Sequence, residues 1–530
     1  MGIFSTITVM KRNKIEKLKE RLSPWEYYHH RLPNLKEEEI EESDIFYLKN
    51  FGIYTTKQNP KNFMLRLRFD QKELPLDLAR FILDNINAST KLLITARGQL
   101  ELHGLTFEGA RTLHYLFQKQ GLTSCQTLMD NIRSIVSDPL YDIAQDSIFN
   151  VMPLIKKMQK LFLEKQKWCG MLPRKFNTAI AANKTLTAPF WGNDCYFALA
   201  NKDDSYGFHL YVGGKNTHFA QDCDIFVRYE DVVEMYEAVL QTYLVHGLRA
   251  SRTKARLYHL IKDVGLEKFK ELLRSYYPKK WQSGGETVIH FHEPTKQWFM
   301  LKDGGWAYRY FTKFGEVTKA EFAHIIDLAQ KHHATLRLGI DQNIYMISLA
   351  EPNIEIDSKP HTVLACAGSK YCIYSLFDTK EAAATLPIER LNKNDITVGY
   401  SGCLKGCGRH IVADIGFVGI RLNQYGKVER GVRLYMGALH SKGTFPARLI
   451  FWAVPLRKLN ALIETILDIF ERSGYDSFET FCQNEINQYE EEKVAYFFLL
   501  RMKGEDIKLS SLDLPSHEAF LALQKELFSS

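Results

Sequence analysis

Two pairs of cysteines stand out in this sequence because the members of each pair are closely spaced. Cys366 and Cys372 are six residues apart in ACAGSKYC, and Cys403 and Cys407 are four residues apart in YSGCLKGCGRH. Four thiolates can bind one zinc ion or a cubane iron–sulfur cluster. Zinc sites usually take pairs two to four residues apart, which suits only the second pair, whereas a cluster accepts wider loops. The spacing favours a cluster, with zinc and unrelated buried cysteines as alternatives.

The other five cysteines are isolated. Nine cysteines in a chain of 530 residues do not indicate a disulfide framework, because long cytoplasmic chains reside in a reducing compartment. Isolated cysteines are usually small buried side chains. We expect that role for Cys125, Cys169, Cys195, Cys223 and Cys482.

Length and charge limit the possible functions. A chain of 530 residues is too long for one hydrophobic core, and its 45% hydrophobic residues can fill several. The net charge of +7 is spread without a polybasic block, which argues against nucleic acid and fits a small anion or an acidic protein partner. No apolar run approaches the roughly 18 residues that span a membrane. The N-terminal MGIFSTITVMKRNK has its charges after its apolar residues, the reverse of a secretory signal, so we expect a cytoplasmic protein.

A helix–strand unit occurs twice in the chain. In the first copy, apolar residues at helical spacing over 78–82 precede a strand-like run from Leu92. In the second copy they occupy 322–326 and precede a run from Leu336, so both elements are shifted by 244 residues. We call this constant shift the repeat offset. The sequence therefore predicts an internal duplication.

A second repeat extends the duplication over most of the chain. GFHLYVGG at 207–214 resembles GVRLYMGA at 431–438, and YYPKKWQSGGE at 276–286 predicts a linker between two halves. Thr318 and Glu321 have capping-box spacing, which predicts the start of the second-half helix. Two related halves predict a pseudo-twofold molecule with one shared site.

The cysteine quartet, the duplicated unit and three basic motifs together resemble the nitrite and sulfite reductase family, whose members hold sirohaem coupled to a [4Fe–4S] cluster. The resemblance covers about residues 45–480, and its most specific part is the quartet with VADIGFVG at 412–419. It implies an α+β, pseudo-twofold duplicated sirohaem reductase fold with paired ferredoxin-like half-domains and two α/β lobes. The implied domains are an N-terminal extension (1–45), half-domain 1 (46–120), sirohaem-binding lobe 1 (121–285), half-domain 2 (286–355), cluster- and sirohaem-binding lobe 2 (356–480) and a C-terminal extension (481–530).

The resemblance implies that all four cysteines ligate the cluster. In the family the last of the four is also the axial ligand of the sirohaem iron, which makes Cys407 the bridge here. A shared thiolate brings two redox centres into bonding contact, so electrons delivered singly can be stored beside the iron that holds substrate. Gly406 lets the loop approach a bulky cluster. Lys405 and Arg409 either offset negative charge nearby or are ordinary loop cations.

Three basic motifs supply the other residues that the resemblance places in the site. They are LLITARGQLELHG with Arg97, DNIRSIVSDPL with Arg133, and LPRKFNTAI with Arg174, Lys175 and Asn177. A planar guanidinium binds a carboxylate or an oxyanion through two parallel hydrogen bonds. By resemblance, Arg97, Arg133, Lys175 and Asn177 contact the substrate, and Arg174 belongs to the cofactor-binding set.

The sequence departs from the family pattern at two places. Residues 96–98 read Ala–Arg–Gly where the family usually has Thr–Arg–Gln, so a hydrogen-bonding side chain near the macrocycle is missing, and Gln99 or Glu101 could compensate. Leu404 and Lys405 replace the commoner Pro–Asn of the cluster loop, which changes its rigidity and charge. Neither change removes a ligand.

Asn177 favours nitrite over sulfite as the substrate. Sulfite reductases of the family tend to have RKFK here, and assimilatory nitrite reductases tend to have RKFN. Sulfite carries more negative charge, so a second lysine is more useful for it. LHG at 102–104 is also common in sulfite enzymes, so sulfite remains the alternative. The implied reaction is a six-electron reduction of nitrite to ammonium, or of sulfite to sulfide.

No GxGxxG loop follows a predicted strand, so electrons are expected from a separate carrier, an acidic ferredoxin or a flavoprotein. An alternative from another class is a non-catalytic protein whose cysteine quartet binds a structural metal. Such a protein would not need Arg97, Arg133 and Lys175 to converge, so their placement distinguishes the two hypotheses.

Overall fold

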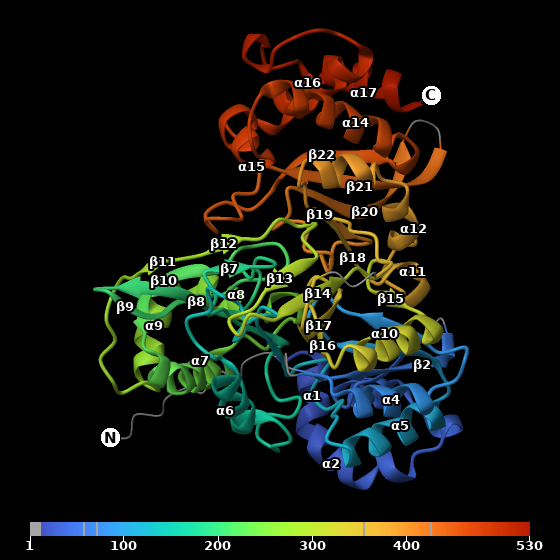
Figure 1. Ribbon diagram of the computed structural model, residues 1–530, viewed down its shortest axis with the longest axis vertical. Helices are drawn as coiled ribbons and strands as arrows, with labels where there is room; N and C mark the ends of the chain where they lie inside the picture. The colour runs from blue at the N-terminus through green and yellow to red at the C-terminus, as the bar shows by residue number, and fades with distance from the viewer. Residues whose placement is uncertain (1–11, 57–58, 70–72, 353–355, 425–426, 530) are drawn as a thin grey trace, which may run out of the picture.

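The computed structural model describes residues 12–529 except 57–58, 70–72, 353–355 and 425–426. In Figure 1 a blue body with the yellow α10 and β16 lies at the bottom, a green lobe lies to its left, and an orange and red lobe lies above. Residues 1–11, which carry most of the argument against a secretory signal, lie outside the described residues.

The lower body contains the first of two ferredoxin-like units. Its sheet has the strand order β1–β2–β4–β3–β15. Thr106 accepts a hydrogen bond from the backbone N–H of Gly109 and so caps the helix that follows β4. The elements are β1 (Ile53–Thr56), β2 (Asn59–Leu67), α4 (Leu76–Asp84), β3 (Lys91–Ile94), β4 (Leu100–Leu105), α5 (Phe107–Lys119) and β15 (Glu316–Val317).

The second unit repeats the first at the repeat offset. Its sheet has the order β13–β14–β17–β16, and its elements are β13 (Trp298–Met300), β14 (Trp306–Tyr310), α10 (Lys319–Lys331), β16 (Thr335–Leu338) and β17 (Ile344–Leu349). Strands β16 and β17 begin and end at the repeat offset from β3 and β4. The register also agrees, since Lys91 pairs with His103 and Thr335 with Ile347. Thr318 and Glu321 form the predicted capping box of α10.

The two units share one hydrophobic core. Helices α4 and α10 pack against each other, and Ile82 and Ile325 are fully buried between the sheets and helices. The N-terminal helices α1 (Lys14–Arg21), α2 (Pro24–His30) and α3 (Glu42–Asn50) complete this body. Tyr27 and Leu32 are fully buried in the same core, so the N-terminal segment is an integral part of the body.

Lobe 1 is built on a mixed sheet with the order β10–β9–β8–β6–β5. Strands β5, β6 and β8 run parallel, and β8, β9 and β10 run antiparallel. The elements are β5 (Ile132–Val136), α6 (Met152–Phe162), β6 (Phe176–Ile180), β7 (Thr185–Leu186), β8 (Cys195–Lys202), β9 (Ser205–Val212), β10 (Gln221–Val227), α7 (Val232–His246), α8 (Leu257–Val264), α9 (Leu266–Arg274), β11 (Glu286–Thr287) and β12 (His290–Phe291). Because β11 pairs with β8 and β12 with β7, residues 286–291 lie along this lobe.

Lobe 2 has the same topology as lobe 1. Its order is β18–β19–β20–β21–β22, with β18, β19 and β20 parallel and β20, β21 and β22 antiparallel. The echoed sequences therefore lie on equivalent strands, β9 and β21. The elements are β18 (Val363–Ala365), α11 (Gly368–Tyr371), α12 (Thr379–Ala384), α13 (Ile388–Lys393), β19 (Val398–Ser401), β20 (Ile415–Gln424), β21 (Lys427–Met436), β22 (Arg448–Pro455) and α14 (Leu456–Ser473).

The C-terminal segment covers lobe 2. It contains α15 (Phe478–Phe481), α16 (Glu491–Lys503) and α17 (His517–Ser529). Helix α16 packs on β22 and α14, and α17 packs on α16 (Figure 1). The side chain of Phe528 is fully buried, as expected for a helix that packs on the body. Among the helices of the described residues, none has the length and apolarity needed to span a membrane.

Candidate functional site

The fold brings the four clustered cysteines together at one edge of the lobe 2 sheet. Cys366 follows β18 and Cys403 and Cys407 follow β19, and because these strands are parallel neighbours, their loops leave the same edge. The Sγ of Cys366 accepts a hydrogen bond from the backbone N–H of Gly402 at 3.2 Å, which ties the first loop to the second. Cys372 ends the short helix α11 between them.

The thiols of the quartet are close enough to influence one another's pKa. Burial raises the pKa of Cys372, and the thiols of Cys366 and Cys403 raise it further. The pKa of Cys403 is raised by burial and by Cys407 and Cys366. A metal must displace these protons, so ligation would stabilise the thiolates that burial disfavours. The donor set is therefore suited to a soft metal centre.

The positions of the four thiols do not by themselves select a cluster or a single ion. Within the described part of the chain, no three His, Cys, Asp or Glu side chains are positioned around one metal ion. The wide spacing of Cys366 and Cys372 is the observation that favours a cluster, because a cubane accepts cysteines from wider loops than zinc does.

Cys407 is the most accessible cysteine of the quartet. Its side chain is exposed to solvent, whereas the other three are half-buried. Burial is nevertheless the largest cause that raises the pKa of Cys407. An accessible thiol at this position would be open to a second, bulky cofactor as well as to the cluster.

Cations from the first half of the chain lie near Cys407. Lys175 and Arg66 both stabilise the thiolate form of Cys407 and lower its pKa against the effect of burial. Burial lowers the pKa of Lys175 to about 7, with Arg256 adding to the shift and Cys407 opposing it. The structure thus brings Lys175 from lobe 1 next to the Cys407 loop of lobe 2.

The predicted arginines belong to the same cationic group. Burial lowers the pKa of Arg133, and the neighbouring charges of Arg66, Arg174 and Arg97 lower it further. Among the described residues, no group accepts a hydrogen bond from the buried Nε of Arg133. A group of mutually repelling cations with a buried unused donor is a site for an anion. Arg97, Arg133 and Arg174 therefore lie close together, an arrangement that a protein with only a structural metal would not need.

The arginines also hold the two strands of lobe 1 that form the site. Arg97, in the turn between β3 and β4, donates to the carbonyls of Ser134 at 2.5 Å and Thr178 at 3.2 Å. Arg133 donates to the carbonyls of Thr127 and Met129. The site therefore depends on half-domain 1 as well as on lobe 1.

Asn177 and Arg133 lie on the neighbouring parallel strands β6 and β5. Ile132 of β5 pairs with Phe176 of β6 and Ile135 with Thr178, so Arg133 and Asn177 lie where the register shifts. The backbone N–H of Asn177 donates to Asp194 at 2.8 Å, and its side chain is buried. The site thus presents one buried amide, in place of a second lysine, beside its cations.

Arg66 is a functional candidate that escaped the sequence analysis. It lies on β2 and forms an ion pair with Glu101 of the adjacent strand β4, and Glu101 contacts His103. Although burial opposes it, Arg66 and His103 lower the pKa of Glu101 to about 2. The charged residues Glu101 and His103 alternate along a strand, which signals one polar face. Glu101 is thus committed to Arg66 and cannot supply the missing amide.

Arg409 has a partner that the sequence did not indicate. Its guanidinium donates to the carbonyl oxygen of Ala96, so it ties the Cys407 loop to the turn that carries Arg97. Gln99, the other residue considered as a substitute for the missing amide, donates to the hydroxyl of Ser134 at 2.6 Å. Both contacts position the turn of Arg97. The turn itself has Gly98 at φ 59°, and its counterpart at the repeat offset has Gln342 at φ 69°.

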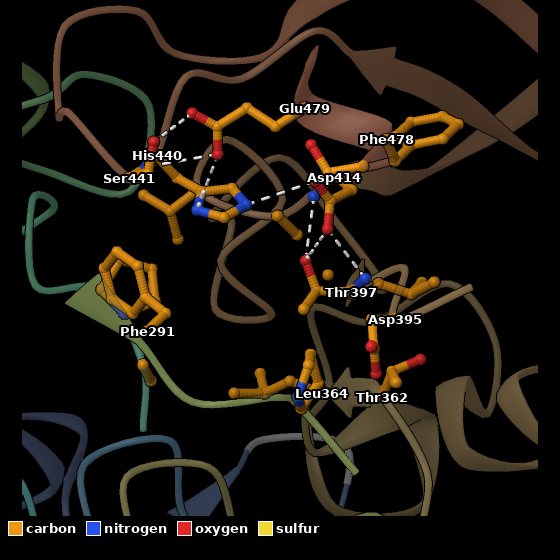
Figure 2. Close-up of a pocket in the computed structure, with 18 of the residues that line it drawn as sticks. Phe291, Thr362, Leu364, Asp395, Thr397, Asp414, His440, Ser441, Phe478 and Glu479 are labelled. Carbon is orange, nitrogen blue, oxygen red and sulfur yellow. Dashed lines mark hydrogen bonds and ion pairs between the residues drawn. The ribbon is translucent and has the colours of Figure 1, made fainter. Parts of the chain in front are cut away.

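A large cavity of about 950 Å³ begins beside the cysteine loop, at Gly408 and Arg409, and we call it the Asp414 cavity. Its wall includes Asp341, which is the counterpart of Arg97 at the repeat offset. Figure 2 shows His440 between two carboxylates, with Asp414 at 3.2 Å and Glu479 at 3.4 Å. The described residues that line it include none of the predicted site residues. The lining of this cavity thus contains carboxylates as well as the cations Arg309, Lys393 and Arg409.

The fold, the cysteine quartet and the facing cations define a two-lobed iron–sulfur protein with an anion site. A family model described as "Nitrite and sulphite reductase 4Fe-4S domain" matches residues 128–281 and 357–478, slightly more than half of the chain. The chain therefore belongs to the nitrite and sulfite reductase family, as the sequence analysis predicted. Members of this family are oxidoreductases that use sirohaem and a [4Fe–4S] cluster.

Individual relatives agree with this assignment. The chain is 27% identical over 456 residues to "Ferredoxin--nitrite reductase" of Leptolyngbya laminosa, covering 79% of this chain and 89% of the relative. It is 26% identical over 476 residues to "Sulfite reductase [ferredoxin] 1" of Mycolicibacterium paratuberculosis, covering 83% and 84%. The solved structure of the Mycobacterium tuberculosis NirA protein has a TM-score of 0.81 and 22% identity, covering 91% of this chain and 97% of that one. This last likeness shows the predicted α+β reductase fold.

Proposed function

We propose that this protein reduces nitrite to ammonium by six electrons, with sirohaem and a [4Fe–4S] cluster as cofactors. The observation that carries the proposal is the placement of Lys175 and Arg66, from the first half of the chain, beside Cys407 from the second. A thiolate that ends a four-cysteine set and lies close to cations of the other half is the arrangement that a coupled cluster and haem require. The relatives named as nitrite reductases support the choice of substrate.

Each residue of the site has a distinct part in the proposal. Cys366, Cys372, Cys403 and Cys407 would hold the cluster, and Cys407 would also hold the sirohaem, which supplies an iron that binds substrate and receives electrons from the cluster. Arg174 would bind the carboxylates of the macrocycle. Arg97 and Arg133 would attract the anion and draw charge towards its oxygens. Asn177 would orient it by hydrogen bonding.

Lys175 is suited to supply protons. A general acid works best when its pKa lies near the operating pH, and burial brings the pKa of Lys175 to about 7. Arginine is a poor acid because it stays protonated at any working pH. We therefore assign proton delivery to Lys175, with ordered water as its relay.

Sulfite is the second candidate substrate. The "Sulfite reductase [ferredoxin] 1" relative covers as much of this chain as the nitrite reductases do. Against it, the site has Asn177 where a second lysine would help to neutralise a more highly charged anion. The choice between nitrite and sulfite as the substrate thus rests on one residue, Asn177.

The electron donor is proposed to be an acidic one-electron carrier of the ferredoxin type. The outer face of the cysteine loops exposes four apolar side chains, Ile373, Tyr374, Leu376 and Leu404, the last with 61% of its surface accessible. Lys405 lies over the ring of Tyr374, and Lys49 is close enough for Lys405 to lower its pKa. We call these six residues the donor surface. An apolar centre with adjacent cations suits a small acidic protein, and the loops that carry it also carry Cys372 and Cys403.

The domain division remains a proposal, with half-domains at 46–120 and 286–355, lobes at 121–285 and 356–480, and the extensions 1–45 and 481–530. The location in the cytoplasm also remains a prediction from the sequence.

Turnover with chemically reduced viologen tests the substrate. We expect anaerobically purified protein to be green-brown, with a Soret-like band and labile sulfide, and to consume nitrite with formation of ammonium. Higher kcat/KM with sulfite would reverse the order of the two candidates. A colourless protein that contains zinc would refute the reductase altogether.

A further inference from the structure

An N-terminal helix, which precedes the residues matched by the family model, contacts the segments that lead to Arg133 and Lys175 of the anion site. Helix α1 lies at the junction of the lower body and lobe 1 (Figure 1). Its Lys19 is only 4% exposed, and Nζ is 2.8 Å from Asp130 Oδ2 and donates to the carbonyl of Leu172 at 2.7 Å. The matched segments begin at residue 128, so this helix is outside them.

The two partners of Lys19 each lie shortly before a cation of the anion site. Asp130 lies three residues before Arg133, and Leu172 lies three residues before Lys175. The backbone N–H of Leu172 donates to the carbonyl of Asp130 at 3.2 Å, so the two segments already touch. The ammonium group of Lys19 thus binds both segments that lead to Arg133 and Lys175.

The surrounding charges show that the contact is specific. The carboxylate of Asp130 is fully buried and also binds Arg252 and Arg174. Glu16, one turn before Lys19, binds Lys19 at 2.7 Å and Arg249 at 2.5 Å. A buried ion pair stabilises a fold no better than apolar packing does, so such a network is better explained by the geometry that it fixes.

We propose that Lys19 is a positioning residue for the anion site: it holds the Asp130 and Leu172 segments together and so sets the separation of Arg133 and Lys175. The part of the proposal that concerns substrate rests on the proposed function. The part that concerns the two segments does not, because it can be measured without any substrate.

The chain offers matched controls on the same helix. Lys19→Met removes the ammonium group, and Lys19→Gln keeps a hydrogen-bond donor of similar length without the charge. Glu16→Gln weakens the network but leaves the bonds of Lys19 to Asp130 and Leu172. Lys14→Met removes an exposed charge from α1, since the Lys14 side chain is 79% exposed.

Hydrogen–deuterium exchange of the cofactor-loaded protein tests the positioning itself. We expect amides in 130–136 and 172–177 to exchange at least tenfold faster in Lys19→Met, less so in Lys19→Gln, and at the wild-type rate in the two controls. Equal exchange in Lys19→Met and wild type would overturn the proposal. If Lys19→Met does not fold, the Lys19→Gln comparison with Glu16→Gln decides the question in the same way.

Kinetics with reduced viologen test the consequence for the anion. We expect KM for the substrate that the wild type reduces to rise at least fivefold in Lys19→Met, with kcat within twofold, and to be unchanged in Glu16→Gln. A loss of kcat at constant KM, in step with a lower Tm, would mean that Lys19 only stabilises the fold. Absence of turnover by the wild type with either anion would refute the proposed function and leave the exchange result standing.

Discussion

The side chains around Cys407 include charged groups whose charged form is disfavoured by burial. Five cations, Arg66, Arg97, Arg133, Arg174 and Lys175, share one region, and burial is the first cause that lowers the pKa of Arg133 and of Lys175. Such a group is costly unless an anion joins it. The site is therefore poised to bind negative charge, which a sirohaem with its carboxylates and an anionic substrate would both supply.

Replacing Lys175 should reduce catalysis far more than stability. We expect Lys175→Met to lower kcat/KM for nitrite by about 10²–10³-fold, the usual loss when one preorganised donor to a developing charge is removed. Lys165→Met, which removes an exposed lysine, should have no effect. The measurement is viologen-linked nitrite consumption with the sirohaem content of each variant determined. A normal kcat/KM in Lys175→Met with full cofactor would contradict the assigned role.

His440 provides a prediction about pH. Burial opposes protonation of His440, but Asp414 and Glu479 outweigh this effect and raise the pKa of His440. Burial also disfavours the charged form of Asp414, but His440 outweighs that effect and lowers the pKa of Asp414. The histidine contributes stability below about pH 6.5 and loses it as the pH rises through its folded pKa. The carboxylate contributes above about pH 4 and loses its effect as the pH falls.

The stability gained from this pair should therefore be greatest between about pH 4 and 6.5. We expect the difference in Tm between wild type and His440→Gln to be largest near pH 5.5 and to shrink above pH 8. His517→Gln, at an exposed site on α17, serves as the control. A difference that grows with pH would contradict the ion pair.

At the scale of elements, local sequence defined the units and long-range packing defined the site. The helix–strand unit was predicted because its apolar spacing recurs at the repeat offset, and the cysteine loops were predicted because their ligands are close in sequence. Arg66 and Lys19 were missed because each reaches the site from an element with no motif of its own. His440 and Glu479 are distant in the sequence and meet only through the fold. The core that the two ferredoxin-like units share was likewise not predictable from local sequence patterns.

Helix α17 offers a stability prediction at this scale. Phe528 is fully buried on lobe 2, and Leu521 on the same helix is 46% exposed. We expect Phe528→Ala to lower the free energy of unfolding by about 3–5 kcal/mol and Leu521→Ala by less than about 0.5 kcal/mol. Urea unfolding followed by circular dichroism measures both. Equal effects would mean that α17 does not pack as described.

At the scale of the whole molecule, the donor surface allows electron delivery to be tested separately from substrate binding. We expect Leu404→Glu and Lys405→Glu each to raise KM for a ferredoxin donor at least tenfold, since they add repulsion against an acidic partner. With reduced viologen as the donor, both variants should turn over at the wild-type rate. Loss of the viologen activity would show that these changes disturb the cluster itself.

The covalent joining of two similar halves has a consequence for how this protein can change. A symmetric homodimer must repeat every substitution in both of its equivalent cavities. Here one covalent chain has Arg97 in the first turn and Asp341 in the second, so the two equivalent turns carry opposite charges. The duplication thus allows each half to change its electrostatics independently of the other.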